Sequence, residues 1–143
     1  MHIVVDWPHR RLFPNARVHW ASKASLVHST RQRAGIQAAA ALLTAPEEER
    51  LWLNSDAKIP YGLTIVPPDR RRRDEDNVIA SLKSSLDGIA EGLGVNDSRF
   101  RLSWIRWEEP SKMAHIDIAI MEPPPLDFLE SFNVRFKASL ANR

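Results

Sequence analysis

The chain has 143 residues, the length of one ordinary domain and enough to bury a hydrophobic core. It has no cysteine, which excludes disulfides, thiolate catalysis and cysteine-ligated zinc, and 20 Lys and Arg against 18 Asp and Glu leave a net charge of only +2. No stretch approaches the ~20 apolar residues of a membrane span, and the first residues lack the long apolar run of a signal peptide. We therefore expect a cytoplasmic protein without a membrane partner.

The N-terminal part predicts a short strand followed by a basic loop. Residues 2–7 are an apolar run that Pro8 ends, and residues 9–23 then mix several cations with Phe13 and Trp20. Such a loop can contact phosphates through its cations and stack on bases or sugars through its rings. It can also be a surface loop that its two aromatic residues pin to the core. The sequence alone leaves both interpretations open.

A long helix is predicted next. It begins at Ser22 or Ser25 and runs to about Ala45, because its alanine-rich composition favours a helix and Pro46 stops it. The small side chains permit close approach to a sheet or to another helix. The larger apolar residues of its expected packing face are Ile36, Leu42 and Leu43. Residues 47–56 then predict a polar connection that three apolar residues anchor.

Three further strands are predicted from alternation of apolar and polar residues. Residues 59–66 alternate as a half-buried strand and end at a proline pair. Residues 101–107 and 113–121 are expected to form a hairpin across a polar turn. Buried positions are Tyr61, Leu63, Ile65, Ile116, Ile118 and Ile120, solvent-facing ones are His115 and Asp117, and Trp104 and Trp107 are expected in the core or an interface.

Residues 69–100, DRRRRDEDNVIASLKSSLDGIAEGLGVNDSRF, carry the strongest chemical signal. In an extended segment Asp74 and Asp76 point to the same side, and Asp97 can supply a third carboxylate from the turn after a helix. Carboxylates are the hard oxygen ligands that Mg²⁺ or Mn²⁺ prefers. The preceding block, Arg70, Arg71, Arg72 and Arg73, can bring a phosphate backbone to that metal or be an ordinary solvated loop. We favour the first, with Arg73 nearest the acids, and predict a metal-dependent phosphodiesterase acting on nucleic acid.

An amphipathic helix is predicted between these acids. It starts at Asp76 or Asn77 and ends at Gly92 and Gly94, and its apolar stripe is Ile79, Leu82, Leu86, Ile89 and Leu93. An acid at a helix start can simply be a cap, although capping requires one acid and not two. Lys83 and Asp87 share the polar face with Asp76. Lys83 can therefore neutralise charge on a phosphate, or it can form a helix ion pair with Asp87.

Together these elements predict an α/β (α+β) fold. A small mixed sheet carries two main helices in the order β-α-β-α-β-β, as one domain over residues 1–121. Residues 122–143 form a proline-led C-terminal extension whose composition suits a loose amphipathic helix, with Leu126, Leu129 and Phe132 on its apolar side.

The central block resembles a known family. The run PDRRRRDEDN, the pair Lys83 and Asp87, and the turn GVND resemble the core signature of RusA-type Holliday-junction resolvases, with a weaker likeness in FPNARVHW. The likeness covers residues 1–121. Two departures stand out: Asn96 is where an acid is frequent in the family, and Ala80 is where compact members carry the lysine that phage variants place at the spacing of Lys83.

The resemblance implies roles for particular residues. The essential acids would be Asp74, Asp76 and Asp97, which would bind Mg²⁺, and the family works as a homodimer on four-way DNA junctions. It also implies that the N-terminal loop lines the DNA-binding face. The DNA contacts expected in that loop are Asn15, Arg17, His19 and Lys23.

Three functions follow as hypotheses. The leading one is a Mg²⁺-dependent endodeoxyribonuclease, with Mn²⁺ as a possible substitute, that resolves Holliday junctions by paired nicks in recombination or repair. Two divalent ions roughly 4 Å apart can activate the attacking water and neutralise the leaving oxygen. The alternatives are a non-catalytic DNA-binding protein, in which the acids are caps, and a nuclease of broader specificity for branched DNA.

Overall fold

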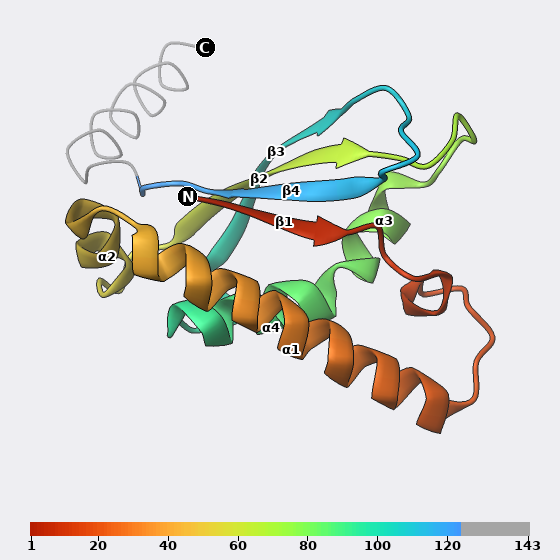
Figure 1. Cartoon of the computed structure of the whole chain (residues 1–143), viewed down its shortest axis with the longest axis horizontal. Helices are drawn as coiled ribbons and strands as arrows, with labels where there is room; N and C mark the ends of the chain where they lie inside the picture. Colours follow the sequence, from red (N-terminus) through yellow and green to blue (C-terminus); the bar gives the residue numbers. More distant parts are fainter. Residues whose placement is uncertain (124–143) are drawn as a thin grey trace, which may run out of the picture.

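The computed structural model describes residues 1–123 as a four-stranded sheet with helices on one face (Figure 1). The strands are β1 (His2–Asp6), β2 (Ile59–Val66), β3 (Phe100–Trp107) and β4 (His115–Ile120). The helices are α1 (Trp20–Thr44), α2 (Glu47–Leu53), α3 (Glu75–Ser81) and α4 (Lys83–Leu93), with 3-10 turns at Arg10–Leu12 and Asp97–Arg99. The predicted α+β class and main element order are confirmed. The predicted C-terminal extension lies, from residue 124 onward, outside the described residues.

The strand order in the sheet is β1-β4-β2-β3. Strand β4 runs antiparallel to both β1 and β2, whereas β3 pairs in parallel with the outer side of β2. The predicted hairpin between the last two strands is therefore wrong. The segment that joins them crosses the end of β2, where Glu108 N–H donates to Ile65 O at 2.9 Å and Ser111 N–H donates to Pro67 O at 2.9 Å.

Burial explains why β4 and not β3 takes the inner position. Ile116, Ile118 and Ile120 of β4 are buried as predicted, and Ala119 on the opposite face is buried as well. In β3 only Phe100 is buried. Because an inner strand is covered on both sides by its neighbours, the more polar strand is stable only at the edge. The seven-residue connection, longer than the usual hairpin loop of about 2–5 residues, allows the crossing.

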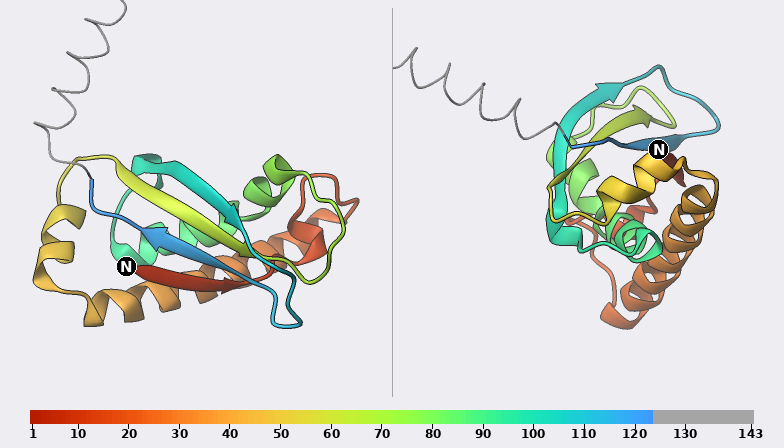
Figure 2. Two further views of the ribbon diagram at one scale, coloured as in Figure 1. Left: turned by 90° about the horizontal axis from the view of Figure 1, so that it is seen from above. Right: turned by 90° about the vertical axis from the view of Figure 1, so that its left-hand side faces the viewer.

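The core lies between the sheet and the helices (Figure 2). Tyr61, Leu63 and Ile65 of β2 are buried on one side, as the alternation predicted. His115 and Asp117 lie on the other face, where Asp117 is 3.0 Å from the ring of His2 on β1. Trp104 lies on this open face too, across Gly62, where an added Cβ would be only 2.0 Å from the indole.

The buried face of α1 differs from the predicted one. Helix α1 starts at Trp20, slightly earlier than predicted, and ends at Thr44 before Pro46. Its buried residues are Ala34 and Ala38, whereas Ile36 and Leu43 are 66% and 79% exposed. Only Leu42 of the predicted packing face contacts the core. The short α2, predicted as a polar connection, is anchored by the buried Leu53.

Glycine explains why α1 turns its smallest residues inward. An added Cβ at Gly88 of α4 would be 2.0 Å from Arg31 O of α1, and one at Gly92 would be 2.2 Å from Gly35 O. The two helices therefore meet backbone to backbone, and only alanine and glycine fit between them. Larger apolar side chains of α1 are left on the solvent side. Within residues 1–123, no helix has the length and apolar character needed to cross a membrane.

We expect Gly88→Ala to destabilise the protein. Alanine in a helix interior gains about 1 kcal/mol over glycine, but overpacking a close contact costs about 1–3 kcal/mol, and a rigid backbone oxygen cannot move aside. The net loss should lower the thermal midpoint by several degrees. Ala40→Ser, on the exposed side of α1, is the matched control and should lower the midpoint only slightly, because serine costs about 0.5 kcal/mol of helix propensity there. A more stable Gly88→Ala variant would contradict the close helix contact.

Candidate nucleic-acid and metal site

Asp74 and Asp76 lie at the N-terminus of α3. Asp74 is the N-cap, and its Oδ1 accepts a hydrogen bond of 3.0 Å from Asp76 N–H. Asp76 is already in the first helical turn, so the expected extended geometry with both carboxylates on one side is not what the chain adopts. Both side chains are exposed. The capping explanation is confirmed for Asp74, and Asp76 gains from the helix dipole without being a cap.

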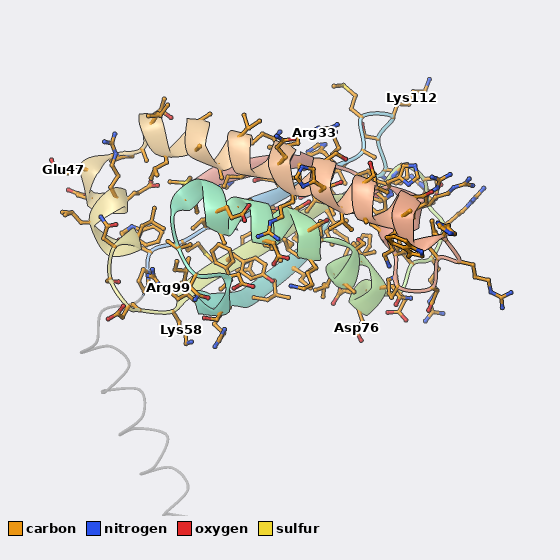
Figure 3. The ribbon with its side chains drawn as sticks, turned by 90° about the horizontal axis from the view of Figure 1, so that it is seen from below. Arg33, Glu47, Lys58, Asp76, Arg99 and Lys112 are labelled. Carbon is orange, nitrogen blue, oxygen red and sulfur yellow. The ribbon has the colours of Figure 1, made fainter. Side chains whose placement is uncertain are left out.

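Asp97 lies at the opposite end of the helix pair. Helix α4 ends at Gly94, which has a φ of 69°, and Asn96 then caps the 3-10 turn that begins with Asp97. Figure 3 shows Asp76 and Arg99, the last residue of that turn, at opposite ends of α3 and α4. At about 1.5 Å per residue, the helix pair separates its two ends by roughly 25 Å.

The three predicted metal ligands are therefore not brought together within one chain. Among residues 1–123, no group of three acidic or histidine side chains is placed to hold a metal ion. Asp97 instead borders a hollow of about 350 Å³ that Arg31 and Glu91 also line. Their ion pair holds the pKa of Glu91 below its usual range, chiefly through the hydrogen bond from Arg31.

The predicted helix between the acids is broken into two. Leu82 separates α3 from α4 and is fully buried. Ile89 and Leu93 of the predicted stripe are buried as well, and Ile79 and Leu86 pack against the core. The opposite face carries Lys83, whose ammonium lies 3.1 Å from Asp87 Oδ1, so the predicted helix ion pair is present.

The arginine block divides into one structural and three exposed residues. Arg73 donates to Asp69 Oδ1 at 2.8 Å, to Asp69 O at 3.0 Å and to Arg71 O at 2.9 Å. Its guanidinium also lies 5.1 Å from the ring centroid of Trp7. Only 17% of its side chain is exposed. Arg73 thus holds the loop together, which differs from its predicted role as the phosphate contact nearest the acids.

Asp69 is the hub of this loop. The Arg71 backbone N–H, and to a smaller extent the Arg73 guanidinium, hold the pKa of Asp69 below its usual value. Arg70 pairs with Glu109 at 3.1 Å in a fully hydrated contact, since both side chains are more than 80% exposed. Such a pair contributes little to stability. Arg70 can therefore exchange its partner for another anion at little cost.

The basic N-terminal loop lies beside the arginine block. Trp7, on which Arg73 stacks, ends the segment that leads into the loop. Farther on, Lys23 of α1 and Lys83 of α4 line one hollow of about 230 Å³, together with the buried Ser84, whose hydroxyl has no partner. Figure 1 shows the loop of the arginine block, the basic loop and α3 together at one end of the molecule, and Lys23 and Lys83 lie near the N-termini of α1 and α4.

A second hollow is lined by cations of the same loop. It measures about 570 Å³ and is lined by Arg10, Arg11, Arg17, His19 and Ser22 among others. Of the predicted DNA contacts, Arg17 and His19 are here, Lys23 borders the neighbouring hollow, and Asn15 is exposed. Arg10 and Arg11 belong to the cations of residues 9–23 that the sequence predicts as possible phosphate contacts.

Most arginines of the described part of the chain already have acceptors. Arg31, Arg33, Arg70, Arg71, Arg73 and Arg106 pair with carboxylates. Arg50, Arg99 and Arg101 donate to backbone carbonyls. Among residues 1–123, the guanidinium groups without such a partner are those of Arg10, Arg11, Arg17 and Arg72.

Comparison with other proteins identifies a relative but no function. No protein-family model matches the chain. A protein of Xylella fastidiosa (strain Temecula1) described as uncharacterized is 38% identical over 98 residues, which is 68% of this chain. The chain covers 61% of that relative. The match carries no activity for either protein.

We predict that Arg73→Ala destabilises the fold, whereas Arg72→Ala does not. Removing Arg73 leaves Asp69 and two carbonyls without their donor, which should cost about 1–2 kcal/mol in urea unfolding. Arg72 is the matched control, an adjacent exposed arginine without an acceptor among residues 1–123. Equal stability of the two variants would show that Arg73 does not organise the loop.

Proposed function

We propose that this protein is a metal-dependent endodeoxyribonuclease that nicks branched DNA, with four-way junctions as its main substrate and Mg²⁺ as its metal. The observation that carries the proposal is the gathering of two exposed carboxylates and several unpaired cations at one end of the molecule. The carboxylates are Asp74 and Asp76, and the cations are those of the basic loop and Arg72. Such an end suits a phosphodiester backbone that has to be held beside metal-bound water.

The acids at α3 fit a hard divalent cation in part. Asp74 Oδ1 is engaged by the Asp76 N–H, which fixes the side chain and leaves Oδ2 free to bind a ligand. Asp76 is exposed beside it. When bound, the metal would supply a water of lowered pKa and would neutralise charge on the phosphate oxygens. Two carboxylates from one chain are a sparse ligand set, so a third donor has to come from elsewhere.

A second copy of the chain can supply that donor. Asp76 of α3 and Lys83 of α4 are exposed, and 22% of the Asp87 side chain is exposed. We propose that these alternating charges pair antiparallel with those of a second copy about a two-fold axis. In the register that sets Lys83 opposite Asp87 of the other copy, the two α4 helices run antiparallel. The C-terminal end of one α4, which leads to Asp97, then approaches the N-terminal end of the other, which follows α3. Each metal site would then combine Asp74 and Asp76 of one chain with Asp97 of the other.

This arrangement suits the substrate. A four-way junction has near two-fold symmetry, and a two-fold dimer places two equivalent sites on strands related in the same way. Arg72 and the arginines of the basic loop would hold the backbone, and such phosphate contacts carry little sequence information. The resemblance of the central block to RusA-type resolvases supports the same acids, the same substrate and the same dimer.

The second candidate is a non-catalytic DNA-binding protein. It is favoured by the capping role of Asp74 and by the absence of a three-acid cluster within residues 1–123 of one chain.

A nuclease of broader specificity for forks and flaps is the third candidate. Synthetic junctions, forks and duplexes incubated with Mg²⁺ or EDTA separate all three. Binding without nicking supports the second, and nicking that ignores branching supports the third.

Substitution by asparagine separates capping from metal binding. Asn caps a helix about as well as Asp, so Asp74→Asn and Asp76→Asn should keep the thermal midpoint and junction binding but lose nicking in Mg²⁺. Asp74→Ala is the comparison, because it should also lose about 1 kcal/mol of stability. If both asparagine variants nick junctions at the wild-type rate, the acids are only structural.

Mixing two inactive variants tests the shared site. Equal amounts of Asp76→Asn and Asp97→Asn chains should form mixed dimers with one intact and one doubly substituted site, so nicking of junction strands should return to about a quarter of the wild-type level. Each variant alone should stay inactive. An inactive mixture, with mixed dimers demonstrated by two affinity tags, would contradict a site shared between chains.

A further inference from the structure

Trp20 lies at the start of α1, and packing in the core does not explain its presence there. Trp20 is 77% exposed, the highest exposure of any aromatic side chain among residues 1–123. The sequence left open whether it pins the basic loop to the core, and that interpretation is now corrected: Phe13 packs against the core and Trp20 does not. A large apolar ring in water stabilises nothing by itself.

The imidazole of His19 lies next to the indole of Trp20. His19 is the N-cap of α1, and its Nδ1 accepts from Ala21 N–H at 3.4 Å. The imidazole and the Trp20 indole have centroids 5.8 Å apart with their planes 31° from parallel. Because the cap fixes the imidazole, the two rings form an aromatic shelf at the end of a rigid 25-residue helix. One face of the indole is left to solvent.

The surroundings of the shelf are cationic. His19 also lines the 570 Å³ hollow with Arg10, Arg11 and Arg17, and no acidic residue takes part in that lining. These three are among the four described arginines that lack an internal acceptor, as shown above. Trp20 does not line this hollow itself, and His19 connects the indole to it. Exposed rings near guanidiniums bind single-stranded nucleic acid, because cations follow the backbone and bases stack on the rings.

We propose that Trp20, supported by His19, is a stacking platform for an unpaired base, and that Arg10, Arg11 and Arg17 hold the phosphates on either side of that base. A base paired within a duplex has both faces covered by its neighbours and offers no surface to the indole. The platform therefore selects DNA with unstacked nucleotides, such as the crossover of a four-way junction or a single-stranded end. This inference deepens the proposed function, on which it rests for the choice of DNA as ligand.

The test is a binding measurement in EDTA, where no cleavage occurs. Fluorescence anisotropy would compare three probes: single-stranded oligo(dT), a four-way junction with two unpaired nucleotides at its centre, and a fully paired duplex. Trp20→Ala should weaken binding to the first two about tenfold and to the duplex less than about twofold. Trp20→Phe should restore most of the loss, because phenylalanine keeps a stacking face.

Two further variants separate stacking from charge and from general apolar exposure. Arg17→Gln should weaken binding to the two probes with unpaired nucleotides and lower their slope of log K against log salt by about one, whereas Trp20→Ala should leave the slope unchanged. Leu43→Ala is the matched control, since Leu43 is 79% exposed on the far end of the same helix. It should bind every probe like the wild type. Thermal midpoints establish that each variant is folded.

The outcomes keep the two proposals apart. Equal weakening of all probes by Trp20→Ala, or no weakening, would overturn the platform even if the wild type nicks junctions. Selective weakening in a protein that nicks nothing would support the platform and overturn the nuclease. Binding to phosphatidylserine vesicles that depends on Trp20, without binding to any oligonucleotide, would assign the ring to a membrane surface and also overturn the platform.

Discussion

The backbone contact between α1 and α4 is the constraint on which the rest of the molecule depends. Gly88 and Gly92 bring α4 so close to α1 that a methyl group would collide with a carbonyl oxygen. This contact fixes α1 along the helix pair and sets Lys23 beside Lys83. The basic loop, which leads into α1, is thereby held at the same end as the N-terminus of α3. The cationic surface and the two acids are adjacent because two helices touch without side chains between them.

The same helix pair keeps the acids apart. Asp74 and Asp76 start α3, Asp97 follows α4, and the intervening helix is too long for the three to meet within one chain. A metal site built from all three would require a second copy, as proposed above. Dimer formation and catalysis would then be coupled, because a monomer would lack a complete ligand set.

The internal pairing of cations distinguishes structure from candidate function. The Arg73 guanidinium is already bound within the loop by Asp69, two backbone carbonyls and the ring of Trp7. Among residues 1–123, Arg10, Arg11, Arg17 and Arg72 have no such acceptor. A guanidinium that is hydrated in the free protein can bind a phosphate without first breaking an internal hydrogen bond. Arginines without an acceptor among residues 1–123 are therefore better candidates for phosphate contacts than the density of arginine in the sequence indicates.

The sequence by itself determined the class of fold, the main element order without α2, the core faces of β2 and β4 and the end of α1 before Pro46. These features depend on the local periodicity of apolar residues and on the proline and glycine residues that end helices and strands, which are properties of neighbouring residues. The sequence left open whether Lys83 pairs with Asp87 or acts on a phosphate. Only the tertiary structure decided that β4 lies between β1 and β2, that α1 buries alanine instead of Ile36 and Leu43, that Arg73 is structural and that Asp97 is remote from Asp74. Those outcomes depend on competition between distant segments for the inner positions of the sheet and for the narrow contact between two helices. A pattern of neighbouring residues does not predict which segment takes those positions.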